Sequence, residues 1–205
     1  MPSPRTTKGK NTRNRLLETA TMLFHRKSVN GVSIDEVLMA SKTGKGQFYH
    51  YFANKEHLVR EVLKGQIQIF IGDQEQVLDN LDSLSDLAEW FASIRAWHEN
   101  QNRWDGCPIG CMAAELDPQD DDLCNLLRAA FDGWEQPIAQ CFRRMQRRGE
   151  LSGHADPERL AGFVVAANQG GMLMTKARRS GEPLHNAHLS ILDYLKGLGT
   201  QPFGQ

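Results

Sequence analysis

The sequence predicts an all-α fold of about nine helices, and three observations support this class. Apolar residues recur at spacings of three and four along most of the chain, which is the period of a helix face. The alternation of Val, Ile and Thr that is typical of strands is missing. Capping signals at Ser33, at Asn54 and at Asp156-Pro157 mark where helices begin. At 205 residues, the chain is long enough for two domains.

The first quarter of the chain is predicted to contain short helices separated by tight turns. Ser33 and Glu36 form a capping box that starts a second helix over 33–40. A third short helix follows over 45–52, and Asn54 caps a longer fourth helix. The buried face of the first helix is predicted to hold Leu16, Leu17, Ala20, Leu23 and Phe24.

Longer helices are predicted beyond residue 64. Pro108 and Pro157 suit the first turn of a helix, whereas Pro137 falls inside the longest segment and predicts a kink there. The expected ranges are about 86–102, 108–116, 121–148, 157–178 and 183–198.

The two ends of the chain differ in charge, although the whole chain carries a formal charge of only −1. Residues 1–64 contain twelve Lys and Arg against five Asp and Glu, and residues 65–205 contain twelve against twenty. Such asymmetry indicates a basic module that meets a polyanion, joined to an acidic module with another role. A basic but merely solvated surface is the alternative.

Composition excludes several classes of protein. The longest uninterrupted apolar run, Phe163–Ala167, is far shorter than the roughly 20 residues of a membrane span. The first ten residues are polar and basic, without the apolar core of a secretory signal. Four cysteines are too few for a disulfide scaffold. We therefore expect a cytoplasmic protein with reduced thiols and no membrane association.

Two short helices joined by a tight turn inside a basic segment are typical of a helix-turn-helix that binds DNA. A generic helical hairpin is the alternative. The run Phe48-Tyr49-His50-Tyr51-Phe52, followed by Lys55-Glu56, decides between them because the chain resembles the TetR family of bacterial transcriptional regulators here. At the level of motifs the resemblance covers about residues 11–60, and the rest agrees in layout.

The resemblance implies two domains with different functions. Residues 1–54 would be the helix-turn-helix DNA-binding domain, with 1–10 as a flexible basic arm. Residues 55–205 would bind a ligand and form a dimer. The turn departs from the family pattern, because Lys42 stands where glycine is usual and Gly44 where a small hydroxyl residue is usual. Lys42 is thus expected in a left-handed conformation, with Thr43 or Gly44 capping the next helix.

The expected DNA contacts lie on and beside the third helix. Gln47 is the candidate for base readout, because its amide can pair with adenine through two hydrogen bonds. Lys45 suits phosphate or guanine, and Gly46 allows the backbone to approach DNA closely. Phosphate contacts are expected from Tyr49, His50 and Lys55, the last at a helix N-terminus that favours anions. The full set is Thr43, Lys45, Gly46, Gln47, Tyr49, His50 and Lys55, with Arg5, Lys8, Lys10 and Arg13 as arm residues that either reach DNA or stay solvated.

A dimer is expected because a single unit buries too little DNA for a specific site, whereas a two-fold dimer reads a palindromic operator. The resemblance implies that the last two helices pair with their copies in a four-helix interface. Filling the core of one chain is the alternative for the same residues. The interface candidates are Phe163, Ala167, Gly171, Met174, Leu184, Ile191 and Leu195.

The resemblance also implies a small-molecule effector whose binding shifts the spacing of the two DNA-reading heads. Aromatic and apolar residues of the C-terminal part suggest an apolar or aromatic compound, although plain core is the alternative for each of them. The candidate lining residues are Trp90, Ile94, Trp97, Trp104, Met112, Phe131, Trp134, Phe163 and Met172. The chain is therefore interpreted as a repressor that a ligand releases from its operator.

A second interpretation uses the same scaffold as a redox or electrophile sensor. Cys107 precedes a predicted helix, whose free amides would stabilise a thiolate, and Cys111 lies one turn on. Two small buried side chains are the alternative. His185 and His188 lack further ligands at metal spacing, so no metal or other cofactor is expected. The sequence contains no pattern of a nucleophile and its base and no phosphate loop, so we do not expect an enzyme.

Overall fold

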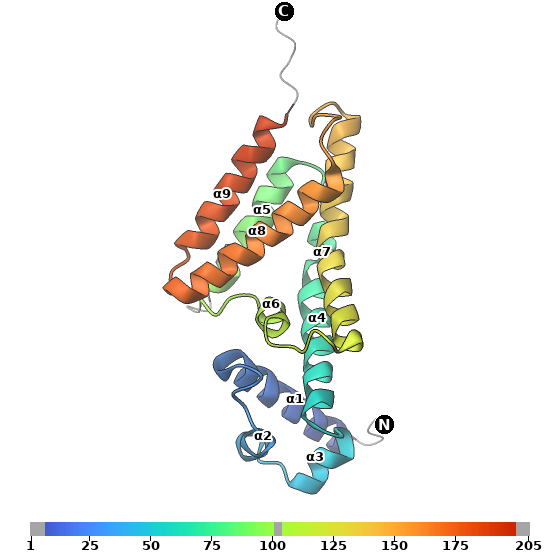
Figure 1. The fold of residues 1–205 in the computed structure, drawn as a ribbon, viewed down its shortest axis with the longest axis vertical. Coiled ribbons are helices and arrows are strands. Elements are labelled where there is room, and N and C mark those ends of the chain that lie inside the picture. The colour runs from blue at the N-terminus through green and yellow to red at the C-terminus, as the bar shows by residue number, and fades with distance from the viewer. Residues whose placement is uncertain (1–6, 101–103, 200–205) are drawn as a thin grey trace, which may run out of the picture. The chain divides into compact units, whose positions relative to one another are not determined.

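A computed structural model describes residues 7–100 and 104–199, apart from the side chains of residues 7, 8, 70, 71, 73, 75 and 100. These residues form nine α-helices and no strand, which confirms the all-α class (Figure 1). The helices are α1 (Thr7–Lys27), α2 (Ile34–Ser41), α3 (Lys45–Tyr51), α4 (Lys55–Asp79), α5 (Leu84–Asn100), α6 (Pro108–Ala113), α7 (Asp121–Arg147), α8 (Pro157–Arg178) and α9 (Glu182–Gly197).

The helices pack as two compact units. The first unit comprises Met1–Ile69 with Pro108–Leu126, and the second comprises Phe70–Cys107 with Leu127–Gln205. This division by packing differs from a cut between residues 54 and 55, because α6 and the first turns of α4 and α7 pack with the N-terminal helices. The division into a DNA-binding and a ligand-binding part is a functional one and stays a prediction.

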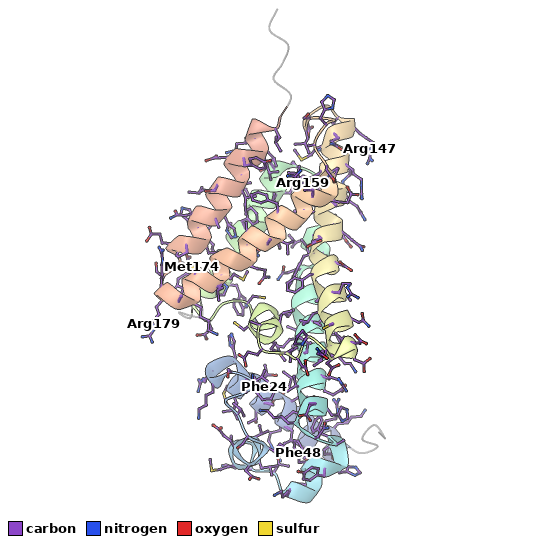
Figure 2. All side chains as sticks on the ribbon, viewed as in Figure 1. Phe24, Phe48, Arg147, Arg159, Met174 and Arg179 are labelled. Carbon is purple, nitrogen blue, oxygen red and sulfur yellow. The ribbon has the colours of Figure 1, made fainter. Side chains whose placement is uncertain are left out.

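The first unit is built on α1, which contacts both α2 and α3. Phe48 and Phe52 have no exposed surface, and their ring centroids lie 5.5 Å apart. Burying two such rings stabilises the unit by several kcal/mol, at roughly 1.5–3 kcal/mol for each large apolar side chain. Figure 2 labels Phe24 and Phe48 within this unit. The core side chains also include Leu16, Ala20, Phe24, Val37, Leu58 and Val62.

The second unit is organised around α9, which packs against both α8 and α5. Gly171 of α8 sits directly over α9, because a Cβ atom there would lie 3.1 Å from the Cβ of Ala187 and from the Cα of Leu184. The absence of a side chain at residue 171 therefore lets the two helices approach closely. Other core side chains are Leu87, Phe91, Ile138, Phe142, Val164, Ile191 and Leu195.

Several helix ends differ from the sequence expectations by a few residues. α6 ends at Ala113 rather than near residue 116, and α4 continues to Asp79. α7 continues as one helix from Asp121 through Pro137 to Arg147. Among the described residues, no helix is both long and apolar enough to cross a membrane.

Candidate nucleic-acid interface

Helix α3 presents a polar face to solvent and an apolar face to the core. Lys45, Gly46, Gln47 and His50 are exposed, and 47% of the surface of Tyr49 is accessible. Phe48 points the other way and is fully buried. A Cβ atom built on Gly46 would meet nothing within 4 Å, so the backbone at this position faces open space. The face is therefore free to enter a groove of DNA.

The turn between α2 and α3 is set by Lys42. Its backbone is left-handed, with φ 52° and ψ 44°, as the sequence leads one to expect. Its N–H and that of Thr43 reach back to the carbonyls of Met39 and Leu38, which closes the end of α2. Gly44, rather than Thr43, is the N-cap of α3. A non-glycine residue in this conformation costs roughly 1 kcal/mol.

The structure corrects the expected role of Thr43. Its side chain is buried, its hydroxyl donates to the carbonyl of Ser41 at 3.2 Å, and it accepts from Arg15 at 3.5 Å. This hydroxyl holds the turn together and faces the interior, so it is not placed to contact DNA.

Gln47 caps its own helix in the absence of DNA. Its Oε1 atom accepts from the backbone N–H of Gly44 at 3.3 Å, a long hydrogen bond. Pairing with adenine through two hydrogen bonds uses both the oxygen and the nitrogen of the amide. The oxygen that would accept from adenine is therefore the same atom that caps α3, and its second lone pair is the one left for the base.

The remaining candidate contacts surround α3. The Nζ atom of Lys45 lies 3.9 Å from a carboxylate oxygen of Asp35, and both side chains are exposed. Such a surface pair contributes at most about 1 kcal/mol, so the lysine is free to move to a phosphate. Lys55 is half-buried at the first position of α4. Asn54 caps this helix by accepting from the N–H of His57 at 2.8 Å.

The basic arm is only partly described. Arg5 lies outside the described residues, as does the side chain of Lys8. Residues 7–10 are the first turn of α1, so this part of the expected arm is helical. Arg13 forms an ion pair with Glu61 and stacks over the ring of Phe52, so it holds α1 against α4 and α3.

The residues proposed for a ligand site do not form one cluster. Trp97 and Phe163 are more than two-fifths exposed, and Met112 belongs to the first unit. Trp104 lies over Gly181, where a Cβ atom would come within 2.4 Å of its ring, and it stacks with His98. Phe131 and Trp134 contact each other, with ring centroids 5.8 Å apart. Trp90, Ile94, Trp134 and Met172 are buried.

Trp134 nevertheless differs from the other core residues of this set in its buried indole N–H. Its side chain is 5% exposed, and its indole N–H has no hydrogen-bond partner in the described part of the chain. By contrast, the indole N–H of Trp90 donates to Gln74 at 3.1 Å. A buried N–H without an acceptor costs roughly 1–3 kcal/mol, so an acceptor supplied from outside would be favourable at Trp134.

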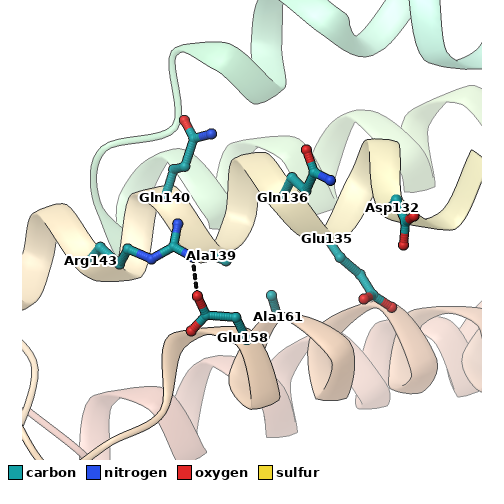
Figure 3. Close-up of a pocket in the computed structure, with 8 residues that line it drawn as sticks. All are labelled: Asp132, Glu135, Gln136, Ala139, Gln140, Arg143, Glu158 and Ala161. Atoms are coloured by element: carbon teal, nitrogen blue, oxygen red, sulfur yellow. Dashed lines mark hydrogen bonds and ion pairs between the residues drawn. The ribbon is translucent and has the colours of Figure 1, made fainter. Parts of the chain in front are cut away.

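A polar groove of about 350 Å³ lies between α7 and α8. None of the residues predicted to bind a ligand lines it. Arg143 and Glu158 form an ion pair across it, while Asp132 and Glu135 project into it from α7 (Figure 3). Sequence reasoning missed this groove because its residues lie on the polar face of α7, which periodicity assigns to solvent. Its other lining residues are Gln136, Ala139, Gln140 and Ala161.

The candidate dimer residues separate into two groups. Phe163 and Met174 are 41% and 42% exposed, and Ala167 is partly exposed. Gly171, Leu184, Ile191 and Leu195 are buried within the single chain, where they pack α8 and α9 together. These four residues correct the expected set, because a partner cannot reach them. Sequence reasoning omitted three exposed apolar residues of these helices, Leu173, Leu189 and Tyr194.

None of the four cysteines, all within the described ranges, forms a disulfide. Cys107 is buried with 7% exposure and immediately precedes α6, and Cys111 is partly exposed within that helix. Burial raises the pKa of Cys141 to about 11, so this thiol stays protonated at neutral pH. No group of His, Cys, Asp and Glu side chains suited to a metal ion occurs in the described ranges.

Two family models match most of the chain. Residues 16–62 match the family model for bacterial regulatory proteins of the tetR family, and residues 83–191 match that for the C-terminal domain of tetracyclin repressor-like proteins. The transcriptional repressor DhaR of Mycobacterium sp. strain GP1 is 30% identical over 177 residues, which cover 84% of this chain and 86% of DhaR.

Solved structures agree with the fold. A regulatory protein TetR from Rhodobacter sphaeroides superposes with a TM-score of 0.76 at 26% identity, covering 88% of this chain and 97% of that one. The reduced form of NemR from E. coli gives a TM-score of 0.76 at 23% identity, covering 95% and 100%. These relatives are transcriptional regulators and not enzymes. The family models together span most of the chain, which therefore belongs to the TetR family of DNA-binding transcriptional regulators.

Proposed function

We propose that the chain is a repressor that binds a palindromic operator as a homodimer and is released by a small, largely apolar or aromatic molecule. The observation that carries the proposal is the exposed polar face of α3, with Gln47 beside Lys45 and Tyr49. DhaR and NemR are both named as repressors, which supports repression rather than activation of transcription.

The dimer is supported by apolar side chains that the chain leaves uncovered. Phe163, Leu173, Met174, Leu189 and Tyr194 lie on α8 and α9, and each is at least two-fifths exposed. The rings of Phe163 and Tyr194 meet edge to face at 5.4 Å, so the two helices share one apolar surface. Contiguous exposed apolar surface is typical of an interface.

The effector is supported by Trp134. Its buried indole N–H without an acceptor suits a ligand that carries a carbonyl, carboxylate or ether oxygen on an otherwise apolar body. Such a ligand acts as an inducer only if it binds the DNA-free arrangement more tightly than the DNA-bound one.

The test is a pull-down of sheared genomic DNA with purified, reduced protein, followed by sequencing of the retained fragments. We expect enrichment of a few fragments that share a palindrome, with affinity that falls steeply as salt rises. Uniform retention of all fragments, or none, would contradict specific operator binding. Genes beside the enriched fragments then narrow the choice of compounds for a release assay.

A second candidate, a thiol sensor, uses the same DNA-binding head. It is favoured by one observation, the relation to NemR, whose solved structure is specified as the reduced form. Cys107 is the candidate thiol. An alkylating agent should abolish DNA binding by the wild-type chain and leave the Cys107→Ser variant active. Equal loss in both proteins would exclude Cys107 as the sensor.

A further inference from the structure

The outer side of α2 continues the polar face of α3. Asp35 and Met39 are four residues apart on α2, and they share its outer side, with 81% and 77% of their side-chain or residue surface exposed. Val37 points the other way and is buried. The Oδ1 atom of Asp35 lies 3.9 Å from Nζ of Lys45, the first residue of α3. The two helices therefore present one surface, on which an acid stands beside the residues expected at DNA.

The fold itself does not account for the carboxylate of Asp35. Apart from its contact with Lys45, this side chain forms no hydrogen bond or ion pair with the described residues. The neighbouring Glu36 already places a negative charge in the first turn of α2, and it pairs with Lys27 at 2.6 Å. A charge near a helix N-terminus contributes only about 0.3–1 kcal/mol. The exposed second acid therefore calls for a partner outside the chain.

A carboxylate on a DNA-binding surface has few possible partners. Phosphates repel it, because they carry the same charge. In the major groove, guanine presents two acceptors, and thymine presents an acceptor and a methyl group. The donors are the amines at N4 of cytosine and N6 of adenine. If Asp35 stays at this surface when DNA is bound, it has to face one of these two amines.

We propose that Asp35 and Lys45 together read one G·C base pair in each half-site of the operator. Lys45 donates to O6 or N7 of guanine, and Asp35 accepts from the N4 amine of cytosine. Their charged groups lie 3.9 Å apart, close enough to meet the two bases of one pair. The inference rests on the proposed operator binding and specifies part of the sequence that is read.

The carboxylate of Asp35 also decides between the two partners that suit Lys45, phosphate and guanine. At a phosphate, Lys45 would bring Asp35 close to the same negative charge. At guanine, Lys45 finds two acceptors, and the cytosine of the same pair supplies the donor for Asp35. In an A·T pair the purine offers Lys45 only one acceptor, N7, so this pair is the weaker match.

The test is selection of binding sites by the full chain from a library of random DNA duplexes. The wild-type chain should enrich a palindrome with a fixed G·C pair in each half-site. Asp35→Ala should enrich the same palindrome with that pair relaxed, and Lys45→Ala should relax the same pair. Relaxation of an A·T pair, or of different pairs by the two variants, would overturn the inference.

Titrations by fluorescence anisotropy on the selected duplex measure the size of the effect. Exchange of G·C for C·G in both half-sites should weaken wild-type binding about hundredfold, at roughly tenfold for each changed pair. For Asp35→Ala the same exchange should weaken binding about tenfold or less. This variant should bind a duplex without the palindrome about twofold more tightly than wild type, because a negative charge near the phosphates has been removed.

Glu36→Gln is the matched control, since it removes the same charge from the next residue, whose partner is Lys27. It should leave the base preference unchanged. Binding of Asp35→Ala to a duplex without the palindrome shows that its DNA-binding helices are folded. Uniform tightening by Asp35→Ala on all duplexes, with the wild-type preference kept, would mean that Asp35 only weakens non-specific binding and would overturn base readout.

The outcomes separate this inference from the proposed function. A wild-type chain that enriches no palindrome removes operator binding and the inference with it. A palindrome that wild type and Asp35→Ala enrich alike removes only the inference and leaves operator binding in place.

Discussion

The carboxylate of Glu115 accepts a hydrogen bond from the backbone N–H of Val29 at 2.7 Å. The same oxygen accepts from the N–H of Asn30 at 3.2 Å. Ser28, with φ 73°, turns the chain just after α1, so these two amides have no partner within the helix. A residue that follows α6 thus fixes the turn between α1 and α2.

We predict that Glu115→Ala lowers the free energy of unfolding by about 1–3 kcal/mol, because the buried Val29 amide loses its acceptor. Glu115→Gln should lose less, since its amide oxygen still accepts. Urea denaturation followed by circular dichroism measures the difference. Glu18→Ala is the control, because Glu18 is exposed on α1. A loss at Glu115 no larger than at Glu18 would show that the carboxylate does not hold the turn.

The two roles of Gln47 are separable by substitution. Gln47→Ala removes both the cap on Gly44 and the base-reading amide, whereas Gln47→Glu retains an oxygen for the cap. Both variants should lose about 1–3 kcal/mol of discrimination between matched and mutated operators, because both lack the amide donor. Only the alanine variant should also lose stability. Binding titrations by fluorescence anisotropy on both DNAs provide the measurement. Unchanged discrimination in both variants would place base readout elsewhere.

Lys55→Ala should weaken binding to every sequence alike, since a phosphate contact positions the protein without reading bases. The plot of log K against log salt should become shallower by about 1, which is the share of one phosphate contact. The same anisotropy titrations at several salt concentrations check this. A selective loss on the matched operator would instead assign Lys55 to base readout.

Lys42→Gly should stabilise the chain by about 0.5–1 kcal/mol, because glycine adopts the left-handed conformation without the steric cost. Thermal unfolding measures the effect. Ala40→Gly is the matched control two residues earlier in α2, where glycine should cost about 1 kcal/mol. If both substitutions destabilise to the same extent, the turn at residue 42 carries no strain.

His188 makes stability depend on pH. Its Nε2 lies 2.8 Å from Oδ1 of Asn168, its Nδ1 lies 3.3 Å from Arg95, and its ring stacks on Phe91. Since Arg95 can only donate, Nδ1 accepts and Nε2 carries the proton. Burial lowers the pKa of His188 from 6.5 to about 3, with Arg95 and His185 acting in the same direction.

The folded chain therefore keeps His188 neutral, while the unfolded chain protonates it below pH 6.5. Its contribution to stability is complete above that pH and is lost as pH falls from 6.5 towards 3. At pH 5 the loss is about 2 kcal/mol, at 1.36 kcal/mol per pKa unit. Urea denaturation at pH 7.5, 6 and 5 should show this loss in wild type and not in His188→Gln. Equal pH dependence in the two proteins would place the titration at another group.

The sequence alone identified most helices and their caps because these signals are local. Ser33, Asn54 and Asp156 each accept from amides two or three residues ahead, so a short stretch of sequence is enough to predict them. The left-handed turn at Lys42 was predictable on another ground, because Lys42 stands where the family pattern has glycine.

The contacts of individual side chains required the tertiary structure. Trp104 was interpreted as a ligand contact, yet it covers Gly181, which is 77 residues away in the chain. Glu115 gave no signal in the sequence, because its partners are backbone amides 85 and 86 residues away. Thr43 was expected at DNA and is instead buried in the turn.

The sequence determined the helices, the polar face of α3 and the family, whereas the tertiary structure decided which apolar residues the chain covers by itself. Helix α8 is apolar on more than one side, so the helical period does not reveal which side faces α9. Packing against α9 buries Gly171 and leaves Phe163 and Met174 at the surface. Periodicity fixes which residues share a face, but only a neighbouring helix fixes whether that face is core or interface.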